Sequence, residues 1–115
     1  MLEPFDQGFL LLFTTDDIPG AIRSFAMAIR LDPDYARAYL NRGMAYERIG
    51  NLQQAVEDFS RAIDLEPEEG KIYYIRSVAH RHLGMAKEAM DDLKKAAALG
   101  YRSARETLRS IRVDW

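Results

Sequence analysis

The chain has 115 residues, of which 48% are hydrophobic and 30% charged, with a formal net charge of −2 and no cysteine. This composition excludes a disordered tail, a disulfide framework and a thiolate metal site, and the length allows one domain with a continuous core. The longest apolar run, residues 9–13, is too short to span a bilayer, and no targeting segment is recognised. We therefore expect a cytoplasmic protein with no membrane partner.

The charge is distributed unevenly along the chain. Residues 1–35 carry two basic and six acidic side chains, residues 36–69 carry four and seven, and residues 70–115 carry ten and five. The basic C-terminal third indicates either a solvated helical surface or a preference for an acidic partner. Nucleic acid is not an expected partner, because acidic residues interrupt the basic ones and no aromatic stacking pattern accompanies them.

The first two helices are predicted over 5–15 and 18–31. Pro4 stands at a position that the start of a helix tolerates, and Pro33 follows the second helix, which it cannot continue. The first helix is apolar on nearly all sides, so a helix at this end exposes apolar surface unless something covers it. Its candidate residues for self-association are Phe5, Phe9, Leu12 and Phe13.

The next two helices are predicted over 35–49 and 52–65, with Gly50 and Asn51 at the turn between them. The sequence then repeats with a period of 34 positions, since Ala21, Phe25 and Pro33 correspond to Ala55, Phe59 and Pro67. Small residues such as Gly43 are expected where two helices approach closely. Each period therefore consists of a helix, a tight turn and a second helix.

The last three helices are predicted over 69–83, 86–98 and 102–112. A further step of 34 positions leads from Ala55 to Ala89 and from Phe59 to Leu93, so the pattern occurs a third time. In the final helix, Ala104, Leu108 and Ile111 lie four and three positions apart, which predicts one apolar face that covers the preceding pair.

Residues 36–69 resemble the tetratricopeptide repeat family, through Tyr39, Gly43, Tyr46, Gly50, Ala55, Phe59, Ala62 and Pro67. The resemblance implies an all-α fold, a right-handed solenoid of about three TPR helix-turn-helix repeats plus a C-terminal capping helix. It divides a single domain, 1–115, into a degenerate repeat (1–35), the best match (36–69), a divergent repeat (70–103) and the cap (102–112). The first repeat fits only if one residue is inserted near 14–17.

The resemblance also implies a protein–protein interaction module, in which the first helix of each repeat lines a concave groove that binds a partner peptide or protein. The groove candidates by this analogy are Arg37, Leu40, Asn41, Met44, Arg48, Lys71, Tyr74, Ile75, Val78, Arg81 and His82, and Glu47 lies on the same face. An apolar strip with a basic rim predicts a partner that is acidic and partly hydrophobic. Alternatively, a terminal helix or a second copy of the chain covers the strip.

Some family members bind C-terminal carboxylates through a clamp of lysine, asparagine and arginine side chains. Only Asn41 and Lys71 match that clamp, and the other places hold Asp6 or Phe5, Leu10 or Phe9, and Ile75. A carboxylate clamp is therefore not expected. The alternative function is a structural scaffold, which assembles with itself as a homo-oligomer through the apolar first helix.

No residue pattern predicts catalysis, a metal site or a cofactor. There is no glycine-rich phosphate loop and no nucleophile motif, so we do not expect an enzyme. His80 and His82 are two places apart, and on a helix they point in different directions, so they are not expected to bind one metal ion. His80 is assigned a packing or surface role, and Asp91 and Asp92 are expected to be solvated.

Overall fold

The computed structural model describes residues 2–111, and the regular secondary structure in this part of the chain is helical, with no strand. The elements are α1 (Pro4–Leu10), a π-helical segment η1 (Leu11–Thr15), α2 (Ile18–Leu31), α3 (Ala36–Arg48), α4 (Leu52–Leu65), α5 (Gly70–His82), α6 (Ala86–Ala98) and α7 (Arg102–Ser110). The seven predicted helices are confirmed, except that the first is divided between α1 and η1. Position 112, at the end of the last predicted helix, lies outside the described residues.

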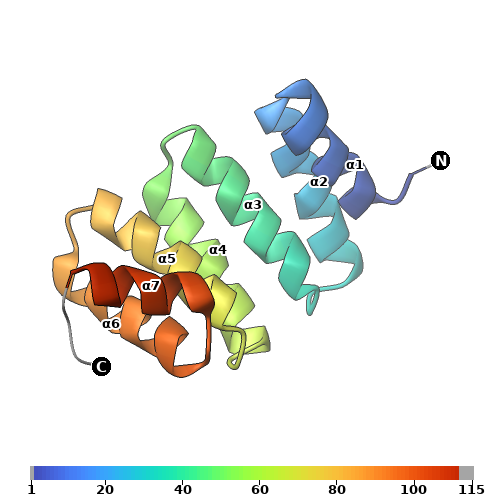
Figure 1. The fold of residues 1–115 in the computed structure, drawn as a ribbon. Coiled ribbons are helices and arrows are strands. Elements are labelled where there is room, and N and C mark those ends of the chain that lie inside the picture. The colour runs from blue at the N-terminus through green and yellow to red at the C-terminus, as the bar shows by residue number, and fades with distance from the viewer. Residues whose placement is uncertain (1, 112–115) are drawn as a thin grey trace.

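The helices form hairpins that follow one another along an elongated molecule (Figure 1). Each helix packs against the helix before it and the helix after it, and the principal extents are 49 × 25 × 21 Å. α7 lies beside α5 and α6 at the end away from α1 (Figure 1). The predicted solenoid with a capping helix is therefore confirmed.

The core of the first two hairpins is built around a glycine that faces a phenylalanine. A Cβ atom added to Gly43 would lie 2.5 Å from Phe59, and one added to Gly8 would lie 2.8 Å from Phe25. Both phenylalanines are completely buried. The close approach that the sequence predicted at Gly43 is confirmed, and Gly8 occupies the equivalent place in the first hairpin.

One extra residue separates glycine and phenylalanine in the first hairpin, and η1 accommodates it. Gly8 precedes Phe25 by 17 positions, whereas Gly43 precedes Phe59 by 16. A π-helical turn contains one more residue than an α-helical turn, so it absorbs an insertion without ending the helix. The insertion predicted near 14–17 is thus present, and it falls slightly earlier, in Leu11–Thr15.

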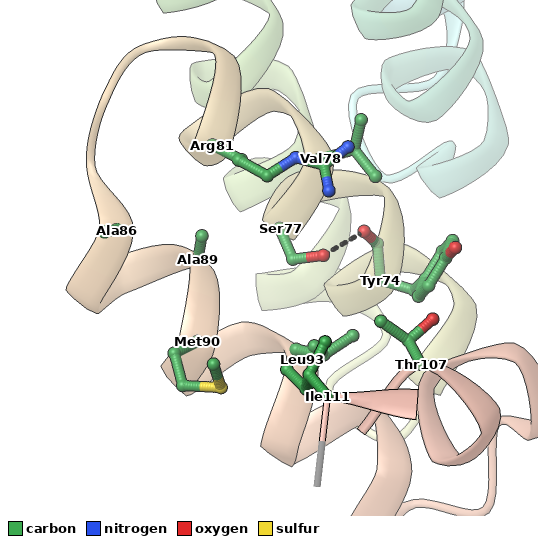
Figure 2. A pocket seen from close by; sticks show the side chains of 10 residues that line it. All are labelled: Tyr74, Ser77, Val78, Arg81, Ala86, Ala89, Met90, Leu93, Thr107 and Ile111. Carbon is green, nitrogen blue, oxygen red and sulfur yellow. Dashed lines mark hydrogen bonds between the residues drawn. The ribbon is translucent and has the colours of Figure 1, made fainter. Parts of the chain in front are cut away.

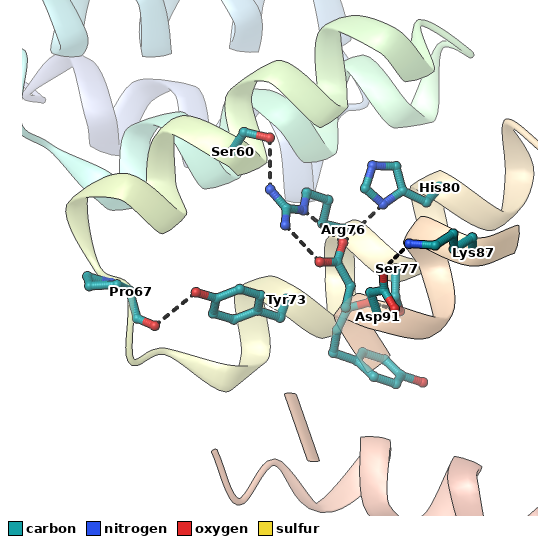
Figure 3. Close-up of polar contacts among 10 residues, drawn as sticks. Ser60, Pro67, Tyr73, Arg76, Ser77, His80, Lys87 and Asp91 are labelled. Carbon is teal, nitrogen blue, oxygen red and sulfur yellow. Dashed lines mark hydrogen bonds and ion pairs between the residues drawn. The ribbon is translucent and has the colours of Figure 1, made fainter. Parts of the chain in front are cut away.

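Buried ion pairs recur with the same period as the repeat. Arg42 donates two hydrogen bonds of 2.8 Å to Asp58, and Arg76 donates bonds of 2.8 and 2.7 Å to Asp92 (Figure 3). The hydrogen bond with Asp58 raises the pKa of Arg42, and the bond with Asp92 raises the pKa of Arg76. Burial raises the pKa of Asp58, an effect that Arg42 opposes. Each pair joins the two helices of one hairpin.

The pair in the third hairpin extends to two further side chains. Arg76 also donates to the hydroxyl of Ser60 in α4, and His80 Nδ1 lies 3.0 Å from Asp92 without the alignment of a hydrogen bond (Figure 3). The prediction of a solvated Asp92 was wrong, because this side chain points into the hairpin and is buried. Asp91 is exposed, as predicted, and His80 is a packed core residue.

Candidate binding groove

The register of the repeats shows which residues of α1, α3 and α5 occupy equivalent places. Gly8 and Gly43 make the same contact with a phenylalanine, so Phe9, which follows Gly8, is equivalent to Met44. Val78 lies one full period after Met44 and is the third member of this row. The row therefore continues the predicted apolar strip from α3 and α5 onto α1.

The candidates on α3 differ in their exposure. Arg37 and Arg48 are exposed, and Leu40 and Met44 are half-buried against the core of the second hairpin. Asn41 is buried and only 7% exposed, so a ligand in the groove has little access to it. Asn41 was one of only two residues that matched the carboxylate clamp, and its burial further weakens that match.

The candidates on α5 form a similar mixture of half-buried apolar residues and exposed charges. Lys71, Arg81 and His82 are exposed, whereas Tyr74, Ile75 and Val78 are half-buried. The ring of Tyr74 packs against Tyr101 with their centroids 5.2 Å apart. The strip on α3 and α5 is thus a shallow surface that also belongs to the core, and not a row of fully exposed side chains.

The candidates for self-association on the first helix divide into two groups. Leu12 is completely buried and Phe5 is 8% exposed, because both belong to the core cluster with Phe25. The proposal that their side chains contact a second copy was therefore wrong. Phe9 and Phe13 are 40% and 43% exposed, and their rings lie 4.7 Å apart. These two rings remain available to a partner.

Two arginines of α3 contact the aromatic residues of the first helix. The guanidinium of Arg48 donates a 2.7 Å hydrogen bond to the carbonyl oxygen of Leu12 and lies 5.5 Å from the centre of the Phe13 ring. The guanidinium of Arg37 lies 5.4 Å from the Phe5 ring. Such cation–π contacts hold the cations beside the apolar row. Sequence reasoning missed them because the pattern of residues along a helix does not show which cation faces which ring of another helix.

Glu47 introduces one negative charge on the same face. Its Oε2 atom is buried and has no hydrogen-bond partner. Burial raises the pKa of Glu47, and the nearby His82 of α5 opposes this effect. A buried carboxylate oxygen without a hydrogen-bond donor destabilises the ionised side chain. The ionised form of Glu47 therefore lowers the stability of the folded protein.

Two hollows lie along the first helices of the hairpins. The hollow at the α7 end has a volume of about 390 Å³ and is lined by Tyr74, Ser77, Val78, Arg81, Ala86, Ala89, Met90, Leu93, Thr107 and Ile111 (Figure 2). We call it the α5–α7 recess. A smaller hollow of about 260 Å³ contains Arg37, Leu40 and Lys71 together with Glu66 and Glu69. Sequence reasoning predicted neither hollow.

The architecture defines a helical-repeat protein, and the comparisons with known families identify its type. Family models described as tetratricopeptide repeat match residues 9–80 and 70–99. The chain belongs to the tetratricopeptide repeat family. No curated protein sequence matches it.

Several solved structures share the fold over most of the chain. The second TPR of Spaghetti (RPAP3), bound to the HSP90 peptide SRMEEVD, has 29% sequence identity and a TM-score of 0.79, covering 84% of this chain and 88% of that chain. The Arabidopsis OM64 TPR domain has 26% identity and a TM-score of 0.81, covering 93% and 92%. MamA has 27% identity and a TM-score of 0.81, covering 89% of this chain. This chain covers only 59% of MamA.

Among the described residues, no helix combines the length and the apolar character that crossing a membrane requires.

Proposed function

We propose that the protein is an interaction module that binds an acidic, partly hydrophobic segment of a partner polypeptide along the row of first helices. The observation that carries this proposal is the row of equivalent positions Phe9, Met44 and Val78, with the exposed cations Arg48 and Arg81 on the same helices as Met44 and Val78. Apolar contacts at the centre of such a surface supply most of the affinity, and a charged rim supplies selectivity.

The solved relative with the HSP90 peptide supports peptide binding by this fold, although the ligand is proposed to differ. That peptide ends in a carboxylate, and apart from Lys71 the clamp places of this chain hold no cation that could bind it. Asn41 is buried, and Ile75 is an apolar member of the strip. We therefore expect SRMEEVD to bind weakly, and ligands with internal acidic and apolar residues to bind better.

The test is a titration of peptides selected by the wild-type chain from a displayed random library. Phe9→Ala should weaken the selected peptides about tenfold or more, because truncation removes an apolar contact of the row. Met27→Ala is the matched control, since Met27 in α2 is 43% exposed and Phe9 is 40% exposed. Tyr74→Ala should also weaken binding. Thermal melts of this variant distinguish the loss of a ligand contact from a loss of stability. Equal affinities of the wild-type, Phe9→Ala and Met27→Ala proteins would show that the peptides do not bind at this row.

Self-assembly is a second candidate function, and the place of Leu10 favours it. Leu10 is equivalent to Ala45 and Ala79, which are completely buried against the preceding hairpin. In α1 this place is occupied by a leucine that is 42% exposed. Light scattering over a concentration series tests this function, and Leu10→Gln should lower the average mass of any oligomer. A strict monomer at all concentrations would contradict it.

A further inference from the structure

Building on the proposed groove function, we propose that the α5–α7 recess is an anchor site for one bulky apolar side chain of the bound segment. The side chain that enters the recess has the size of leucine, methionine or phenylalanine. A neighbouring acidic residue of the same bound segment pairs with Arg81. The partner class is therefore an acidic segment with an apolar anchor.

Several places that line the recess hold smaller residues than the equivalent places one period earlier. One period after Leu52 and Phe59, the equivalent places hold Ala86 and Leu93. Thr107 of α7 lies one period after Tyr73 of α5, so a threonine stands there in place of a tyrosine. In the second hairpin Phe59 is completely buried against Gly43, so the equivalent volume there is filled by the chain itself.

The walls of the recess are suited to an apolar group. Figure 2 shows Met90 and Leu93 of α6 opposite Tyr74 and Val78 of α5, with Ala86 and Ala89 leaving space beside them. The hydroxyl of Ser77 already donates to the carbonyl oxygen of Tyr74 at 2.6 Å. A polar ligand group deep in the recess would therefore lose its water without gaining a good partner, whereas an apolar group would gain contacts.

The recess is continuous with the proposed groove and has a cation beside it. Tyr74 and Val78 belong both to the recess and to the predicted strip, so a chain in the groove passes the opening. Arg81 lines the recess, and its side chain is exposed. The described part of the chain beyond residue 70 has more basic than acidic residues, which favours an acidic segment at this end.

The test combines peptides with a variable anchor and variants that fill the recess. The probe is a set of fluorescein-labelled nonapeptides with two glutamates on each side of a central alanine, leucine, methionine or phenylalanine. Ala86→Leu and Leu93→Phe introduce the residues that the second repeat has at the equivalent places. Thr107→Tyr likewise introduces the residue that the third repeat has one period earlier, at Tyr73. Met27→Ala is the control outside the groove. Fluorescence polarisation measures the affinities, and thermal melts check the fold of each variant.

We expect the wild-type chain to bind the leucine, methionine or phenylalanine peptide about tenfold or more tightly than the alanine peptide, since the added carbons become buried. At least one filled variant should retain the wild-type melting temperature or exceed it, and it should lose this preference. The alanine peptide should bind the wild-type and filled proteins alike. Replacing the glutamates by glutamines should weaken binding to the wild type and much less to Arg81→Gln.

Four results would overturn the inference. An anchor preference that persists in all folded filled variants would place the anchor elsewhere. Binding of all four peptides with equal affinity would refute the anchor while leaving the groove function intact, whereas no binding of any peptide would count against the groove function itself. The chain's only tryptophan, Trp115, gives the third readout. A shift of its emission in every filled variant would show that the chain's own C-terminal residues occupy the recess.

Discussion

At Gly43 the spacing between α3 and α4 depends on the absence of a side chain. A Cβ atom there would lie 2.5 Å from a ring carbon of Phe59 and 3.1 Å from Cβ of Asp58. The phenylalanine is completely buried, so its ring has no free space into which it could move. The same relation between Gly8 and Phe25 makes this contact a repeated feature of the core.

We predict that Gly43→Leu destabilises the fold by about 3 kcal/mol or more, because overpacking must separate two helices that are in close contact. Chemical denaturation measures the change in the free energy of unfolding. Ser77→Ala is the control, since Ser77 is the equivalent residue of the third repeat and already has a Cβ atom. A midpoint for Gly43→Leu equal to that of the wild type would mean that α3 and α4 are not held at this distance.

Asp16 lies at the corner between the two helices of the first hairpin, where the second and third hairpins have Gly50 and Gly84. Its φ is 57°, and Gly50 and Gly84 have φ values of 82° and 78° at the corresponding turns. A side chain in this left-handed region costs about 1 kcal/mol relative to glycine, although aspartate tolerates it better than most. The ion pair of Asp16 with Arg48 is long, at 3.8 Å, and exposed.

We therefore expect Asp16→Gly to stabilise the protein by roughly 0.5 to 1 kcal/mol. The neighbouring Asp17→Ala should have the opposite effect, at about 1 kcal/mol, because the Asp17 carboxylate accepts a hydrogen bond from the backbone N–H of Gly20 at the start of α2. Thermal melts of both variants measure the two effects. Destabilisation by Asp16→Gly would show that the weak contact with Arg48 outweighs the backbone strain.

At the scale of single elements, the helices could be predicted because their signals are local and periodic. Apolar residues three and four apart, with Gly50, Gly84 and the prolines between them, predicted α2 to α7 closely. The π-helical turn could be predicted only as an inserted residue, because its exact place depends on how Leu11 and Leu12 pack against α2 and α3. The buried ion pairs were missed because a charged residue on a helix carries no signal of the partner 16 positions away.

The adjacent residues Asp91 and Asp92 of α6 provide a test of the buried pair. Asp92 binds Arg76 and lies beside His80, whereas the exposed Asp91 binds only the exposed Lys87 in the described contacts. We predict that Asp92→Ala costs about 2 to 4 kcal/mol, since it leaves a half-buried guanidinium without its partner. Asp91→Ala should change stability by less than about 0.5 kcal/mol. Urea titration of the two variants makes the comparison, and equal effects would contradict the assignment.

Glu47 predicts a dependence on pH, because burial raises its pKa in the folded protein. A raised pKa means that the stability contributed by the protonated carboxyl is present at low pH and is lost as the pH rises through the folded pKa. We expect Glu47→Gln to raise the melting temperature modestly at pH 7 and to have little effect below about pH 4. Melts of both proteins at the two pH values measure the difference. A variant that is less stable at pH 7 would show that Glu47 has a stabilising partner.

At the scale of the whole molecule, the period of the repeat determines which residues share a face, but it does not reveal hollows. The residues that share a face of α3 and α5 could therefore be listed from the sequence, and the register of Gly8 adds Phe9 to this row; its role as a binding groove stays a proposal. The α5–α7 recess could not be predicted in the same way, since a hollow depends on how side chains from α5, α6 and α7 pack together. Comparing side-chain sizes at positions one period apart would have given the signal.

The uneven charge of the chain leads to a prediction about association with an acidic ligand. Lys71 lies on α5 at the proposed groove, and Lys87 lies on α6 and is paired with Asp91. Both lysines are exposed, so Lys71→Gln and Lys87→Gln change the net charge equally without disturbing the core. Any difference between the two variants therefore reports the position of the charge.

Rim charges mainly accelerate the encounter, and salt screens exposed charges beyond about 10 Å at 0.1 M ionic strength. We expect Lys71→Gln to lower kon for a selected acidic peptide about two- to fivefold at low salt, with koff nearly unchanged. The difference from wild type should shrink as salt is raised, and Lys87→Gln should have a smaller effect throughout. Stopped-flow fluorescence over a salt series measures both rate constants. Equal loss of kon in the two variants would mean that only net charge matters, and the binding surface would then not be located at α5.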